Sequence, residues 1–262
     1  MDDKTEKLTE VLKGYGKVAI ALSGGLDSST LLSFAVKTLG GENCMAITAV
    51  APYMMCEELE DAAALCKKLS VEHLTPSFEI PKIVEYNPPN RCYLCKTCVF
   101  SEIVRRAAER GFTTVADGTN ADDMSDYRPG LKALAELGVK SPLLESGIGK
   151  KIISELARSL GIKIKPACAC LLTRLEHGSK ADPAILRKID GAEEFLRACG
   201  FGCVRVRLHS ECARIEIPKE DILRFTIPEN LKKISAELSR IGFKHSALDL
   251  NGYVRGSMNS QK

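Results

Sequence analysis

A glycine pair flanked by hydroxyl side chains constrains the fold of this chain more than any other feature. Ser23-Gly24-Gly25-Leu26-Asp27-Ser28-Ser29 directly follows an apolar run at 18–22 and opens a helical pattern at 27–39. The glycines allow a tight turn and a close approach of the backbone to a ligand. Because loop N–H groups and the helix dipole both favour an anion, the sequence predicts a phosphate-binding loop after a buried strand.

The side chains of this loop divide into hydroxyl donors and one acid. Ser23, Ser28 and Ser29 can donate to phosphate oxygens, whereas Asp27 would repel a bare phosphate and suits bound Mg²⁺. The spacing is neither that of a Walker A loop nor that of a dinucleotide fingerprint. A simple Gly-Gly turn with a serine N-cap is the alternative, which the position after a buried strand disfavours.

The same alternation of short apolar runs and helical patterns continues to about residue 160. An amphipathic helix is predicted at the N-terminus, and further strands and helices follow: strands at 45–50, 71–80 and 113–116, and helices at about 57–69, 102–110 and 150–160. Alternating strands and helices predict βαβ units, and hence an α/β fold whose parallel sheet is covered on both faces.

After Pro166 the pattern changes to that of a small α+β unit. Helices are predicted at 183–199 and about 228–241, and strands at 204–208, 213–217 and near 247–250, the first two with period-two alternation. We therefore expect two domains. Residues 1–165 form the nucleotide-binding domain, and residues 166–262 form an α+β domain for substrate binding or oligomerisation.

Composition and charge limit the location and the partners. No apolar run approaches the roughly 18 residues that a membrane span needs, and the charged N-terminus lacks the features of a secretory signal. A net charge of +3, only 5% aromatic residues and no Trp count against a nucleic-acid binder. We expect a cytoplasmic protein without a membrane partner.

Eleven cysteines are many for a chain expected in a reducing compartment, where thiols serve as metal ligands, catalytic groups or small apolar residues. Cys92, Cys95 and Cys98 lie within seven residues, and Cys-x-x-Cys spacing allows two sulfurs to reach one metal or cluster. Cys168 and Cys170 form a second group. Packing of Cys92 and Cys95 as small apolar residues is the alternative. Packing or structural roles are expected for the remaining six, Cys44, Cys56, Cys66, Cys199, Cys203 and Cys212, with a second metal site as the alternative for the last three.

Polar residues follow the predicted strand at 113–116, where an open α/β sheet binds its ligands. Gly118 allows a close backbone approach, and Thr119 and Asn120 supply polar side chains. Asp122 or Asp123 could orient a metal or substrate. An Asx-rich turn without a ligand is the alternative at this position.

Four arginines form a second candidate site. Arg205 and Arg207 alternate along one predicted strand, so their side chains face the same side. With Arg174 and Arg214 they predict a clamp for a substrate phosphate, because guanidinium forks match phosphate oxygens. A solvated strand face is the alternative.

The Ser-Gly-Gly-x-Asp-Ser signature at 23–28 resembles that of the PP-loop ATP pyrophosphatase superfamily. The resemblance implies an adenine nucleotide α-hydrolase-like sheet, cleavage of ATP between its α and β phosphates, and an adenylated acceptor. Superfamily members include amide synthetases and tRNA thiolases, so the loop leaves the acceptor open.

Stretches outside the loop narrow the resemblance to the LarE family. They are residues 117–123, 127–130, 141–145 with Lys150, the Cys-Leu-x-x-Arg segment at 170–174, and the tail at 248–253. That family inserts sulfur into pyridinium-3,5-dicarboxylate mononucleotide while the nickel-pincer nucleotide cofactor is built. The resemblance implies MgATP, a sulfide or other sulfur donor, and a homo-oligomer, by family precedent a hexamer.

The family has two ways to supply sulfur. In one, a cysteine at the position of Cys170 is sacrificed and becomes dehydroalanine; in the other, a cysteine-bound 4Fe-4S cluster relays sulfur. Cys92 and Cys95 favour the cluster, with Cys170 as third ligand and Cys98 or Cys168 as possible replacements. The resemblance further implies Asp27 as Mg²⁺ ligand and Lys150 as a catalytic cation on the phosphates.

Three other functions fit parts of the sequence. A PP-loop tRNA thiolase shares the loop and the cysteine spacing. An ammonia-using amide synthetase would leave the cysteines incidental. A non-catalytic nucleotide-binding module would bind AMP or ATP without releasing pyrophosphate.

Overall fold

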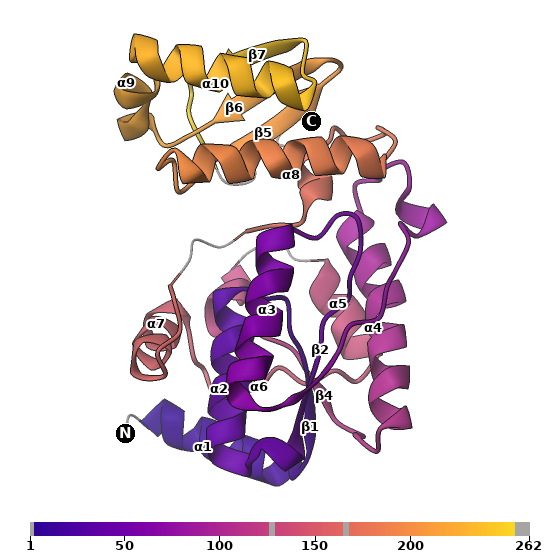
Figure 1. Ribbon diagram of the computed structural model, residues 1–262. Helices are drawn as coiled ribbons and strands as arrows, with labels where there is room; N and C mark the ends of the chain where they lie inside the picture. The colour runs from indigo at the N-terminus through magenta and orange to yellow at the C-terminus, as the bar shows by residue number, and fades with distance from the viewer. Residues whose placement is uncertain (1–2, 126–128, 165–167, 255–262) are drawn as a thin grey trace. The chain divides into compact units, whose positions relative to one another are not determined.

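The computed structural model describes residues 3–125, 129–164 and 168–254 (Figure 1). The chain divides into two compact units. The first unit comprises Met1–Val84 and Pro89–Cys168, and the second comprises Glu85–Pro88 and Ala169–Lys262. The predicted boundary between residues 165 and 166 lies outside the described residues, as do Tyr127 and Arg128 of the LarE-like segments.

A parallel four-stranded sheet of order β3-β2-β1-β4 forms the centre of the first unit. Its strands are β1 (Val18–Ala21), β2 (Cys44–Ile47), β3 (Glu72–Leu74) and β4 (Val115–Ala116). β1 pairs with β2 through Ala19↔Met45 and with β4 through Ala19↔Val115. Because every strand in the ladder runs in the same direction, all carboxyl ends meet at one edge, and the predicted α/β fold is confirmed.

Helices cover both faces of this sheet (Figure 1). They are α1 (Asp3–Tyr15), α2 (Leu26–Leu39), α3 (Cys56–Leu69), α4 (Arg91–Glu109), α5 (Gly130–Glu136), α6 (Pro142–Glu145) and α7 (Lys150–Ser159). Successive strand residues point to opposite faces. Accordingly, Ile20 packs in an apolar cluster with α1, α2 and α7, and Ala19 packs in a second cluster with α4 and α5.

Two predicted elements of the first unit differ from the structure. α4 begins at Arg91 rather than at 102, so Cys92, Cys95 and Cys98 all lie on a helix. Its first turns are polar and cysteine-rich, which hides the helical period. β3 ends at Leu74 instead of reaching residue 80, because Pro76 lacks the N–H that a continuing ladder needs.

The second unit combines a three-stranded sheet with helices. Its elements are α8 (Pro183–Ala198), β5 (Arg205–His209), β6 (Cys212–Glu216), α9 (Ile222–Phe225), α10 (Pro228–Ile241) and β7 (His245–Leu248). β5 and β6 form an antiparallel hairpin, and β7 runs parallel to β6. Among the described residues of both units, no helix is long and apolar enough to cross a membrane.

Candidate functional site

Steric limits fix the course of the phosphate loop between β1 and α2. Gly24 has a φ of +83°, and a Cβ at this position would lie 2.0 Å from the carbonyl oxygen of Glu58 in α3. No other residue type fits there without moving α3. Gly25 is the N-cap of α2 and has no side chain to accept from the first-turn N–H groups. The positive end of the α2 dipole is therefore open to an anion.

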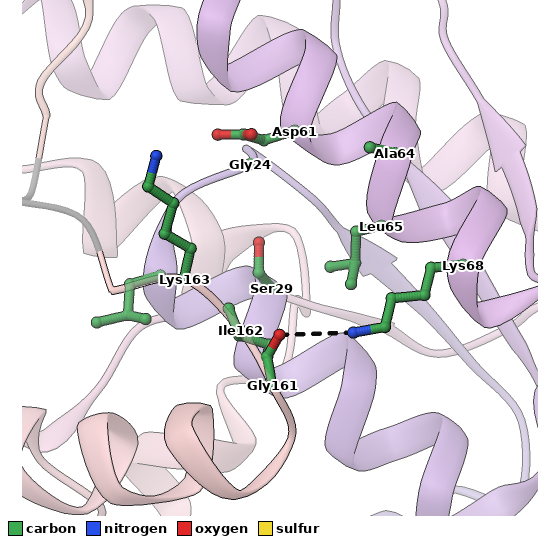
Figure 2. A pocket seen from close by; sticks show the side chains of 10 residues that line it. Gly24, Ser29, Asp61, Ala64, Leu65, Lys68, Gly161, Ile162 and Lys163 are labelled. Atoms are coloured by element: carbon green, nitrogen blue, oxygen red, sulfur yellow. Dashed lines mark hydrogen bonds between the residues drawn. The ribbon is translucent and has the colours of Figure 1, made fainter.

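Hydroxyl groups lock the loop in this conformation. The Oγ atoms of Ser23 and Ser28 lie 3.1 Å apart, and Ser28 Oγ accepts from the Ser23 N–H at 3.2 Å. The Gly25 N–H donates to Ser23 Oγ at 3.2 Å. Ser29 differs, because its side chain points into a cavity on the flank of α2 (Figure 2). Of the three predicted hydroxyl donors, Ser23 and Ser28 thus lie within the loop, and Ser29 faces the cavity.

An ion pair joins the first turn of α2 to the start of α7. Lys150 Nζ pairs with Asp27 Oδ2. Asn120 Nδ2 donates to the same Asp27 oxygen at 3.2 Å and to Asp123 Oδ2 at 3.0 Å. The structure thus brings together the residues predicted to hold Mg²⁺ and phosphate. Asn120 turns its amide nitrogen to both carboxylates while its Oδ1 accepts from the Asp122 N–H, so the carboxylates of Asp27 and Asp123 are the hard donors here that fit Mg²⁺.

Asp122 positions Lys150, a role that the sequence did not reveal. Its Oδ2 accepts from the Lys150 N–H at 2.7 Å and so caps α7. A Cβ on Gly149 would lie 2.8 Å from that oxygen, so glycine permits the contact. A carboxylate at a helix N-terminus is also favoured by the dipole.

The loop after β4 packs directly on the phosphate loop. A Cβ on Gly118 would lie 2.8 Å from the backbone nitrogen of Ser28. The Thr119 hydroxyl donates to Asp117 Oδ2 at 2.5 Å, and Ser141 Oγ donates to Asp117 Oδ1 at 2.7 Å. Asp117 therefore holds this loop in place. Nucleotide binding by Gly118 and Thr119 stays a prediction.

The α4 cysteines differ in their surroundings. Cys92 and Cys98 are exposed, whereas Cys95 is partly buried and its Sγ lies 3.3 Å from the Tyr53 hydroxyl. Burial raises the pKa of the Cys95 thiol above its ordinary value. Tyr53 follows β2, so this contact ties α4 to the carboxyl edge of the sheet.

The predicted 4Fe-4S ligands belong to different units. Cys92, Cys95, Cys98 and Cys168 are in the first unit, and Cys170 is in the second. Within the described ranges, no group of three or more His, Cys, Asp or Glu side chains could hold a metal ion. A 4Fe-4S cluster on Cys92, Cys95 and Cys170 therefore stays a prediction.

Arg174 holds the backbone beside Cys170. Its Nη1 donates to the Ala169 carbonyl at 2.8 Å and to Thr173 Oγ1 at 2.7 Å. Its Nε and Nη2 donate to Glu193 of α8 at 2.8 and 2.9 Å. Glu193 also accepts from the Val206 N–H at 2.9 Å. This buried network fixes the segment that carries Cys170 to α8 and β5.

The other three arginines also lie among acceptors of the second unit. Arg207 pairs with both oxygens of Glu216 at 2.6 and 2.8 Å, and Arg214 shares that carboxylate at 2.9 Å. Arg205 donates to the Val204 carbonyl and lies 5.2 Å from the centre of the Tyr253 ring. Because Arg205 and Arg207 are buried, the alternative of a solvated strand face is wrong. Phosphate binding by the four arginines stays a prediction.

Glu193 and Glu216 are the residues of this network that sequence reasoning missed. Glu193 lies in a predicted amphipathic helix and Glu216 in a predicted strand of alternating polarity. A glutamate in either pattern is ordinarily solvent-exposed. Only the pairing of β5 with β6 and the packing of α8 place them inside. The local sequence carries no signal for either carboxylate.

Comparison with known proteins gives similarities of two different extents. The family described as NAD synthase matches residues 3–88. The chain is 34% identical over 260 residues to pyridinium-3,5-bisthiocarboxylic acid mononucleotide synthase of Lactiplantibacillus plantarum, covering 98% of this chain and 94% of that protein. It is 37% identical over 264 residues to an uncharacterized protein of Synechocystis, covering 99% and 98%. Glutamine-dependent NAD(+) synthetase of Aquifex aeolicus is 41% identical over 68 residues, 26% of this chain and 12% of that protein.

Proposed function

This chain belongs to the LarE family, that of pyridinium-3,5-bisthiocarboxylic acid mononucleotide synthase, and from this premise we propose that it adenylates pyridinium-3,5-dicarboxylate mononucleotide and replaces the AMP with sulfur. The product is a thiocarboxylate. The observation that carries the proposal is the similarity over 98% of the chain, joined to an anion site that pairs Asp27 with Lys150.

The extent of the two similarities favours sulfur transfer over amide synthesis. The similarity to NAD synthase ends at residue 88, before the α4 cysteines and before the part of the second unit that begins at Ala169. The similarity to the bisthiocarboxylic acid synthase continues through both. The shared part contains the phosphate loop, so ATP activation is common to both classes, and the acceptor chemistry resides in the remainder.

The first unit supplies the activation step. In the proposed mechanism the substrate carboxylate attacks the α phosphorus of ATP, and pyrophosphate leaves. The N–H groups of the α2 start and the Lys150 ammonium stabilise the negative charge on the phosphates. Mg²⁺ would be held by Asp27, with Asp123 nearby, and would neutralise phosphate charge. Adenylation is needed because a free carboxylate has no good leaving group.

The second unit supplies the proposed sulfur nucleophile. In the sacrificial route the Cys170 thiolate attacks the acyl carbon and AMP leaves. Loss of the Cys170 α proton then breaks its Cβ–S bond, which releases the thiocarboxylate and leaves dehydroalanine. The network of Arg174 and Glu193 would keep the Cys170 backbone in place during this step. A 4Fe-4S cluster on Cys92, Cys95 and Cys170 is the second sulfur source that we carry forward.

Mass spectrometry of anaerobically purified protein tests the proposal and separates the two sulfur sources. The protein is weighed intact, and its iron and sulfide are measured, before and after turnover with MgATP and the dicarboxylate mononucleotide. The sacrificial route predicts a thiocarboxylate product and the loss of one H₂S equivalent at Cys170. The cluster route predicts the same product, an unchanged protein mass and about four irons per chain.

Matched variants identify the residues concerned. Cys170→Ala abolishes the product by either route. Cys92→Ala abolishes it only if the cluster is the source, and Cys56→Ala, an exposed thiol elsewhere in the first unit, changes neither result. If AMP and thiocarboxylate do not form from this substrate, the proposal is wrong. Tight, steeply salt-dependent tRNA binding would then favour the tRNA thiolase.

A further inference from the structure

A cavity lies on the flank of the phosphate loop, and we infer that it binds a small organic anion, a carboxylate carried on an apolar body. The cavity is formed within the first unit by α2, α3 and the segment 161–163 (Figure 2). Its volume is about 180 Å³, smaller than the roughly 300 Å³ at which sites for drug-sized ligands begin. The inference does not depend on the reaction proposed above.

The hydroxyl group of a mostly buried serine points into this cavity. Ser29 is only 5% exposed, and its side chain is directed at the centre of the space (Figure 2). Its Oγ has no hydrogen-bond partner among the described residues. The hydroxyl faces the open space of the cavity and is not sealed from it, so a ligand atom there can accept a hydrogen bond from Ser29 Oγ.

Two ammonium groups flank the same space. Lys68 of α3 reaches the Gly161 carbonyl at 3.5 Å, and Lys163 extends along the other wall (Figure 2). In the part of the chain that the structure describes, no ion pair or hydrogen bond of the Lys163 side chain occurs. Asp61 is the one acid among the lining residues, so the lining carries two positive charges and one negative charge. The excess favours an anion.

Apolar walls select against a bare inorganic ion. Leu26, Ala64, Leu65 and Ile162 line the remainder of the cavity. Bound pyrophosphate would place a strongly hydrated ion beside these apolar side chains. An apolar ligand would instead remove them from water, which gains roughly 25 cal/mol per Å² of apolar surface buried. A ligand with one carboxylate on a flat or short aliphatic body fits this lining. Its carboxylate would meet the Ser29 hydroxyl and the lysine ammonium groups, and its body would meet the apolar wall.

Such a ligand would contact the phosphate loop on the side that faces α3. Gly24 and Ser29 line the cavity and belong to that loop. Gly24 also packs on Glu58 of α3. A ligand between α2 and α3 would therefore contact both the phosphate loop and the helix on which the loop packs. The site is therefore placed to stabilise the loop conformation that binds phosphate.

Lysine acetylation followed by mass spectrometry tests the site residue by residue, without the reaction. Acetylation rates of Lys68 and Lys163 in the full chain are measured alone and with benzoate, with benzamide, and with pyrophosphate. Benzamide keeps the apolar body without the charge, and pyrophosphate keeps the charge without the body. Lys67, which is exposed on α3 and does not line the cavity, is the internal control.

We expect benzoate to slow acetylation of Lys68 and Lys163 but not of Lys67, and the other two probes to have little effect. Lys163→Gln should weaken the benzoate protection of Lys68 about ten-fold, the effect of losing one charged hydrogen bond, and Lys67→Gln should not. Equal protection by benzamide or pyrophosphate overturns the inference, and so does no protection by benzoate. These outcomes are independent of whether a thiocarboxylate forms.

Discussion

Two ion pairs, one in each unit, have similar chemistry and opposite surroundings. Lys150 and Asp27 meet at the phosphate loop with side-chain exposures of 43% and 21%. Arg174 and Glu193 meet inside the second unit with exposures of 1% and 0%. The first pair lies at an edge that a ligand can reach. The second is enclosed by the unit that holds it.

The difference in exposure between the two pairs bears on how much each one stabilises the fold. Exposed ion pairs contribute little to stability because water screens them. A buried pair is costly to break, because the remaining partner keeps its charge without solvent. We therefore expect the pair of Arg174 and Glu193 to stabilise the segment around Cys170, and the proposed mechanism uses Lys150 and Asp27 at the loop.

The largest expected effect is on the buried pair. Glu193→Ala should lower the free energy of unfolding by about 3 to 5 kcal/mol, since it strands the Arg174 guanidinium and removes the acceptor of the Val206 N–H. Chemical denaturation measures this change. The exposed neighbour on α8 is the control, and Glu194→Ala should change stability by less than about 0.5 kcal/mol. A loss below about 1 kcal/mol for Glu193→Ala would contradict the scaffold role.

The second prediction concerns the accessible pair. Lys150→Met should slow ATP–pyrophosphate exchange about 100-fold, because one preorganised cation is lost from the phosphate site. Its free energy of unfolding should change by less than about 1 kcal/mol. Lys151→Met, the exposed neighbour, should leave both quantities unchanged. If Lys150→Met lowered the free energy of unfolding as much as Glu193→Ala does, the proposed difference between the two pairs would be wrong.

A smaller effect is expected where backbone meets backbone beneath the loop. Gly118→Ala would place a Cβ 2.8 Å from the Ser28 nitrogen, so we expect a loss of about 1 to 3 kcal/mol from overpacking, together with weaker ATP binding. Gly191→Ala, within α8 and with no atom within 4 Å of the added Cβ, should instead stabilise by about 0.5 to 1 kcal/mol. Thermal unfolding with and without MgATP measures both. Equal effects of the two substitutions would refute the close approach.

Local patterns were sufficient to predict the architecture of the first unit and the phosphate loop. The run at 18–22, the glycine pair and the helical period after Leu26 are contiguous, so neighbouring residues carry the signal. The resemblance implied that Asp27 and Lys150 both serve the phosphate site, but not that they pair with each other across 123 residues. The capping of α7 by Asp122 was not predicted, because it depends on how two loops meet.

The second unit shows why the remainder could not be predicted. The period-two pattern at 204–208 revealed a strand, but an arginine in such a pattern is ordinarily solvated. Arg205 and Arg207 are buried because Glu216 comes from the paired strand β6 and Tyr253 from beyond β7. Charge compensation between distant segments has no local signature.

Isotope exchange between labelled pyrophosphate and ATP tests the central claim most directly, because it reports formation of an adenylate without requiring a sulfur source. The account predicts exchange that depends on pyridinium-3,5-dicarboxylate mononucleotide and falls about 100-fold in Lys150→Met. No exchange with this nucleotide would contradict the account, and so would equal exchange in its absence.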